Sequence, residues 1–158
     1  MNTLTLAHVV LSLVGIGSGM VVLYGMLRGK RMDSGTALFL ATTVLTNVTG
    51  FFFPFHEITP GIVVGIISIA LLAFAIVARY VRRLSGGWRS IYVITATIAL
   101  YLNVFVLVVQ LFEKVPDLKA LAPTQKEPPF LVAQVVVMAT FIVLGILAVK
   151  RFRGPAVA

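Results

Sequence analysis

The sequence predicts an all-α polytopic membrane helix bundle with about five transmembrane helices, on the basis of three observations. First, 59% of the 158 residues are apolar and only 11% are charged, whereas soluble domains carry roughly 25% charged residues. Second, five long windows contain no Asp, Glu, Lys or Arg, and about 20 apolar residues in a helix cross a bilayer core. Third, the basic residues gather between alternate windows. This composition excludes a disordered chain, which has low hydrophobicity and high charge.

The uncharged windows define the predicted helices in chain order. They cover residues 3–27, 34–55, 60–78, 90–112 and 130–149. Lipid offers the backbone no hydrogen bonds, so each window must pair its own backbone groups, as a helix does. Too few residues remain for a soluble domain, and we expect a single transmembrane domain over 1–158. The connecting loop 113–129 is rich in proline, and Pro116 opens a stretch where one or two helical turns are expected.

The distribution of basic residues predicts the orientation. Ten of the 13 Lys and Arg residues follow the first, third and fifth windows, which share one side of the membrane if the spans alternate. That side carries about +9, counting Asp33, and the other about −1. The positive-inside rule therefore predicts an outside N-terminus and a cytoplasmic C-terminus. The net charge of +8 then reflects insertion and attraction to anionic inner-leaflet lipids, with no nucleic-acid partner.

Small residues at helical spacing predict where helices pack. Gly15 and Gly19 lie four residues apart in the first window, and Gly61 and Gly65 do so in the third. Glycine at this interval lets two helix backbones approach closely in lipid. The same faces could instead form a homodimer interface, and spacing alone does not separate these uses.

Polar side chains inside the windows predict an outward-facing pocket. Asn47, Asn103, Gln110 and Gln134 all fall in the outer half of their helices. An amide facing lipid is costly, so these side chains should point into the bundle. A pocket there would open beneath the loop 113–129 and could bind the carbonyls of a quinone or a lipid headgroup. The alternative is that the amides bond one another and lock the bundle.

The two histidines suggest a second kind of site. His8 begins the first helix and His56 follows the second, so antiparallel packing brings them to the same depth, with Glu57 beside them. A His/His/Glu group suits zinc or copper, and a His pair suits axial haem ligation. The alternative interpretation is that both are ordinary polar groups at the membrane surface.

Several function classes are disfavoured by what the sequence lacks. The absence of cysteine removes thiolate metal sites and disulfides. Ion-coupled transport usually needs an ionisable residue within a span, and no nucleophile triad or phosphate-binding loop is recognisable. We therefore lean against an enzyme. The expected function is that of a non-catalytic accessory subunit or a binder of a lipid or small hydrophobe. A haem- or metal-binding redox module is the alternative, and a small transporter or channel a further one.

The architecture resembles that of small, uncharacterised polytopic bacterial inner-membrane proteins. The resemblance rests on the span pattern and on two segments, Thr49 to Pro54 and Pro128 to Phe130. It implies a multi-pass protein of the bacterial cytoplasmic membrane and carries no functional motif.

Overall fold

The computed structural model describes residues 2–54 and 58–153, and its regular elements there are all helical, as predicted. Four helical segments are long and apolar enough to cross a membrane: α1 (Thr3–Leu27), Pro60–Val81, α4 (Trp88–Lys114) and α6 (Pro128–Arg151). Pro60–Val81 combines α3 (Pro60–Ile76) with a π-helical turn, η1 (Val77–Val81). The other helices are α2 (Asp33–Gly50) and α5 (Pro116–Leu121). The short helix expected after Pro116 is therefore present.

The second predicted span, residues 34–55, differs most in length from the helix that forms there. The window continues to residue 55, but α2 ends at Gly50, and the amide of Phe51 closes the last turn on the carbonyls of Asn47 and Val48. Pro54 accounts for the early end because it has no amide hydrogen to bond the Gly50 carbonyl four residues earlier, and its ring would clash with that carbonyl in a continued helix. The 18 residues of α2 reach about 27 Å, and threonine lowers their hydropathy. The count of five membrane spans therefore stays a prediction.

Local signals in the sequence set the helix starts. The Asn2 side chain accepts a hydrogen bond from the Thr5 amide at 2.8 Å, and Thr59 caps α3 in the same way immediately before Pro60. Such caps satisfy backbone donors that a first helical turn leaves free. α6 likewise opens on proline at Pro128, where the missing amide hydrogen costs nothing.

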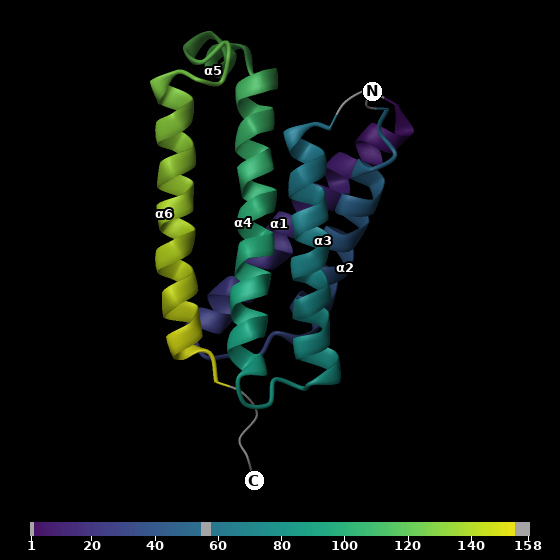
Figure 1. Ribbon diagram of the computed structural model, residues 1–158, viewed down its shortest axis with the longest axis vertical. Helices are drawn as coiled ribbons and strands as arrows, with labels where there is room; N and C mark the ends of the chain where they lie inside the picture. The colour runs from purple at the N-terminus through teal and green to yellow at the C-terminus, as the bar shows by residue number, and fades with distance from the viewer. Residues whose placement is uncertain (1, 55–57, 154–158) are drawn as a thin grey trace.

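The helices form a bundle whose two ends differ (Figure 1). α4 packs against α1, α3, α5 and α6, whereas α2 lies against α1 and α3. The N-terminus lies at one end and the C-terminus at the other. We call the N-terminal end the cavity end, and the opposite end, formed by residues 28–33, 79–89 and 150–153, the basic end. The main apolar core, which includes Phe39, Leu72, Val93, Ala99 and Leu100, lies in the half nearer the basic end.

A charged residue is buried at the basic end, which the uncharged windows did not predict. Arg79 belongs to the π-helical turn and is only 5% exposed. Its guanidinium bonds the carboxylate of Asp33 and lies 5.4 Å from the ring centroid of Tyr92. The Tyr92 hydroxyl in turn bonds that of Thr36 at 3.2 Å. Arg79 is thus a partner in the tertiary packing rather than one more solvated loop charge.

The connection between α4 and α6 packs on these two helices. Phe112, Ala122 and Phe130 form a small apolar cluster beneath it, and the Gln125 side chain donates to the Val109 carbonyl at 3.0 Å. Figure 1 shows α5 above the ends of α4 and α6, away from α2 and α3. The loop 113–129 therefore covers the α4/α6 end of the bundle.

The outer surface of the long helices is apolar. Large hydrophobic side chains are exposed along α6, including Val135, Val136 and Ile142, and along α3, including Ile66 and Ile67. Contiguous apolar surface of this extent is rare on soluble monomers. It is the surface expected where helices face lipid.

Candidate ligand-binding site

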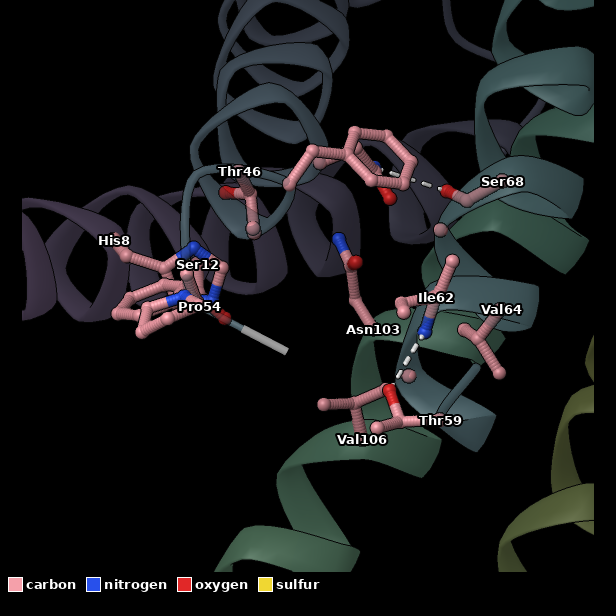
Figure 2. Close-up of a pocket in the computed structure, with 16 residues that line it drawn as sticks. His8, Ser12, Thr46, Pro54, Thr59, Ile62, Val64, Ser68, Asn103 and Val106 are labelled. Atoms are coloured by element: carbon pink, nitrogen blue, oxygen red, sulfur yellow. Dashed lines mark hydrogen bonds between the residues drawn. The ribbon is translucent and has the colours of Figure 1, made fainter. Parts of the chain in front are cut away.

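A cavity of about 300 Å³ lies at the cavity end between α1, α2, α3 and α4. Its wall is mostly apolar and glycine-rich, with polar side chains from all four helices. These are His8, Ser12, Thr46, Asn47, Ser68 and Asn103. Figure 2 shows Asn103 between His8 and Ser12 on one side and Ser68 on the other. A mostly apolar wall with a few convergent polar groups is typical of sites for small molecules.

His8 presents one free ring nitrogen in this region. Its Nδ1 lies 3.0 Å from the Thr49 hydroxyl oxygen, and that hydroxyl is also within hydrogen-bonding distance of the carbonyls of Leu45 and Thr46. Nδ1 either donates to this hydroxyl or accepts from it, and the tautomer of the neutral ring follows from that choice. The other ring nitrogen, Nε2, has no hydrogen-bond partner among the described residues. The ring packs edge-on against Phe53, with centroids 5.2 Å apart. His8 is thus held between Thr49 and Phe53 with one ring nitrogen free.

The two asparagines offer complementary groups. Asn47 donates to the Thr43 carbonyl at 2.8 Å and to the Ser68 hydroxyl at 3.1 Å. Both of its amide hydrogens are then engaged, and among the described residues none donates to its Oδ1. Asn103 makes a single long bond, 3.4 Å from its Nδ2 to the Thr43 hydroxyl. An amide can make four hydrogen bonds, so Asn103 keeps both donor and acceptor capacity for a ligand.

A second cavity of about 490 Å³ adjoins the first between α1 and α4. His8, Ser12, Phe53 and Val106 line both, so these four residues border the two spaces. The second wall adds Gln110, and its far end reaches Glu113 and Lys114. The combined space runs from among the helices to the bundle end.

The amides predicted to form one pocket fall into different places. Asn47 and Asn103 line the first cavity and Gln110 the second. Gln134 lies apart, donating from α6 to the Phe105 carbonyl of α4 at 3.2 Å. The pocket was also expected beneath the loop 113–129. The first cavity lies among α1, α2, α3 and α4, whereas the second reaches the start of that loop at Glu113, Lys114 and Val115. Sequence depth alone could not separate these faces.

Of the glycines predicted to pack helices, some lie at close contacts and Gly61 does not. A Cβ added to Gly19 would lie 2.6 Å from Leu100 Cδ1, and one at Gly15 would lie 3.2 Å from Thr43 Oγ1, so α1 approaches its neighbours closely there. At Gly65 the nearest atom is Phe51 Cζ at 3.2 Å. Gly61 is exposed and lines the cavity instead, with Thr59 Oγ1 the nearest atom at 3.7 Å.

Of the two histidines, the structure describes only His8. His56 and Glu57 lie outside the described residues. Within residues 2–54 and 58–153, no three His, Asp or Glu side chains gather as a metal site would need.

The sequence did not single out Phe53, which lines both cavities and orients His8. The position of Phe53 directly before Pro54 was the available signal, since it marks the point where the chain leaves α2.

Comparison with known protein families, with curated proteins and with solved structures yields no match for this chain.

Proposed function

We propose that this protein is a non-catalytic membrane protein that binds a small amphiphilic molecule in the joined cavities of the cavity end. The observation that carries the proposal is the pair of adjoining cavities, of about 300 Å³ and about 490 Å³, with His8 and Ser12 on their shared wall. Their volumes match those of sites for small ligands. As an accessory subunit, the protein would present or store this molecule for a larger complex.

The side chains favour a ligand with a neutral polar head and an apolar body. Asn103 can donate to a carbonyl or accept from a hydroxyl, and the free ring nitrogen of His8 can bond the same groups, as donor or acceptor according to its tautomer. Among the described residues, the first cavity is lined by no Asp, Glu, Lys or Arg, and the charged residues of the second cavity, Glu113 and Lys114, carry opposite charges. Phe51, Ile62 and Val64 supply apolar wall. A quinone, or a lipid whose head carries hydroxyl or carbonyl groups, has this chemistry.

The proposed setting is the bacterial cytoplasmic membrane, with five spans, an outside N-terminus and a cytoplasmic C-terminus. The termini lie at opposite ends of the bundle (Figure 1), as an odd number of spans requires. The buried Arg79 and the exposed Lys150 and Arg151 share the basic end, which the positive-inside rule assigns to the cytoplasm. The cavities would then open on the outer side.

The proposal is tested by blocking the cavity without disturbing helix packing. Gly61→Leu adds a side chain to the cavity wall, where the nearest atom to its Cβ is 3.7 Å away. Gly17→Leu is the matched control because a Cβ there meets nothing within 4 Å and Gly17 is exposed on α1. Both variants and the parent protein are purified in mild detergent, and organic extracts are analysed by mass spectrometry.

We expect one amphiphile to accompany the parent protein and Gly17→Leu in near-stoichiometric amounts, and to fall at least tenfold in Gly61→Leu. Equal amounts in all three preparations, or no enriched molecule in any of them, would contradict the proposal.

One observation favours the redox alternative, in which His8 and His56 hold haem or a metal. The His8 Nδ1 is engaged with the Thr49 hydroxyl, and the other ring nitrogen has no partner among the described residues; unprotonated, such a nitrogen ligates a metal. The same purified protein tests this. A Soret band or stoichiometric metal that disappears in His8→Leu would support a redox module, and a spectrum unchanged by that substitution would reject it.

A further inference from the structure

A nearly apolar groove of about 540 Å³ runs between α4 and α6, in the half of the bundle nearer the basic end. Ile94, Ile98 and Tyr101 line it from α4, and Met138, Ile142 and Gly145 from α6. Figure 1 shows these two helices side by side over this length. The groove is separate from the cavities of the proposed ligand site, which lie at the opposite end.

Gly145 presents no side chain to this groove. A Cβ at this position would lie 3.4 Å from the Thr97 methyl carbon, in ordinary contact, so a larger side chain would project into the space between the helices. The lining of α6 runs from Met138 to Val149, which is about 17 Å of helix. That length corresponds to one leaflet, half of a hydrocarbon core of about 30 Å.

The groove ends at Lys150, which also lines a basic pocket of about 410 Å³. Arg28, Arg151 and Arg153 complete the charged wall of this pocket. Asp33 is the acidic residue of the basic end, and it is already engaged by Arg79. Four cations therefore surround a pocket whose described lining includes no carboxylate.

The backbone around the basic pocket is fixed. Gly29 has a φ of +67°, where a side chain would be strained. A Cβ added to Gly29 would lie 3.2 Å from the Arg151 carbonyl oxygen, so the two backbones are close there. Arg89 donates to the Val149 carbonyl at 2.8 Å and also bonds the Phe152 carbonyl. These bonds satisfy carbonyls that the end of α6 leaves free. The pocket is therefore a preformed feature between the ends of α1 and α6.

We propose that the α4/α6 groove and the basic pocket together bind one anionic phospholipid of the adjacent leaflet. An acyl chain lies along the groove past Gly145, and the phosphate meets Lys150 and the neighbouring arginines. Charge complementarity identifies this occupant, because an apolar groove leading into a cluster of cations matches a lipid with an anionic head. Basic pockets between membrane helices are known to hold such headgroups.

The proposal is tested by native mass spectrometry of the full chain in detergent. The probes are phosphatidylglycerol and phosphatidylcholine with identical acyl chains. We expect the parent protein to retain one phosphatidylglycerol and to bind phosphatidylcholine at least tenfold more weakly. Lys150→Gln with Arg151→Gln should weaken phosphatidylglycerol binding by roughly 30-fold through the loss of two cation contacts.

Two further variants separate the groove from general charge attraction. Gly145→Leu fills the groove and keeps every cation, and we expect it to abolish retention of phosphatidylglycerol. Its fold is checked by the helical circular dichroism signal, and leucine favours a helix more than glycine does. Arg82→Gln with Arg83→Gln removes the same charge from exposed positions elsewhere at the basic end, and it should retain the lipid.

Four outcomes would overturn the proposal. The first three are equal binding of both lipids, equal loss in the two charge-neutralised variants, and a protein dimer that is dissociated by Gly145→Leu in place of lipid retention. Binding of glycerol phosphate as strongly as the intact lipid would also contradict it, because the groove would then contribute nothing.

Discussion

At the basic end, Arg79 bonds Asp33 and covers the ring of Tyr92, whose hydroxyl bonds Thr36, and the apolar core packs around them. At the cavity end, Asn103 makes one long hydrogen bond, and the surrounding helices leave about 300 Å³ unfilled. Both ends place polar side chains between helices. At the basic end these side chains are closely paired, whereas at the cavity end Asn103 keeps hydrogen-bonding capacity beside open space.

This difference separates polar residues that stabilise the bundle from those that could recognise a ligand. A buried polar group without partners is costly, so most are paired within the protein. Hydrogen-bonding capacity that remains beside open space is where a ligand can be recognised. The contrast predicts that substitutions at the basic end chiefly change stability, whereas those at the cavity end chiefly change binding.

The largest expected effect is at Arg79. Arg79→Leu removes both the ion pair with Asp33 and the contact with Tyr92, and we expect the free energy of unfolding to fall by about 2 kcal/mol. This is below the usual cost of breaking a fully buried pair because the Asp33 side chain is 74% exposed. Reversible unfolding in mixed micelles with increasing sodium dodecyl sulfate measures the change.

Arg82→Leu is the control for Arg79→Leu. The Arg82 guanidinium lies 4.8 Å from the ring centroid of Trp88, but Arg82 is exposed, so its loss should cost only about 0.5 kcal/mol. Equal destabilisation by the two substitutions would show that burial of Arg79 is not what stabilises the basic end.

A smaller effect distinguishes Gln134 from Asn103. Gln134→Leu removes the bond to the Phe105 carbonyl, which joins α6 to α4, and should lower the free energy of unfolding by about 1 kcal/mol. Asn103→Leu removes only a 3.4 Å bond and should change it by less than about 0.5 kcal/mol. Bound amphiphile should change the other way: Asn103→Leu should lose most of it, and Gln134→Leu should retain it. The same unfolding assay, with mass spectrometry of extracts, compares both variants, and loss of amphiphile in Gln134→Leu alone would refute the distinction.

The fold was predictable to the extent that it depends on local sequence. Uncharged windows located α1, α3, α4 and α6 because lipid requires helices that pair their own backbone groups. The end of α2 at Gly50 was missed because Phe51 to Phe53 continue the apolar window, and the effect of Pro54 on the preceding backbone is not a matter of hydropathy.

The candidate site was less predictable because it depends on which helices are neighbours. Asn103, Gln110 and Gln134 have similar depth and chemistry. Asn103 nevertheless lines the first cavity, Gln110 lines the second, and Gln134 bonds the neighbouring helix α4. Arg79 follows the uncharged window directly, and only the fold brings it to Asp33 on α2. Small residues gave the same ambiguity, since Gly65 packs against Phe51 while Gly61 borders open space.

The contrast between the two ends is tested most directly by the reactivity of single cysteines, since the chain has none of its own. Ser12→Cys lies on the wall shared by both cavities, and Thr36→Cys lies beside Tyr92, at a position 1% exposed. We expect a small maleimide to label Ser12→Cys at least tenfold faster than Thr36→Cys in the folded protein. Similar rates at the two positions would contradict the account, because the cavity end would then be as closed as the basic end.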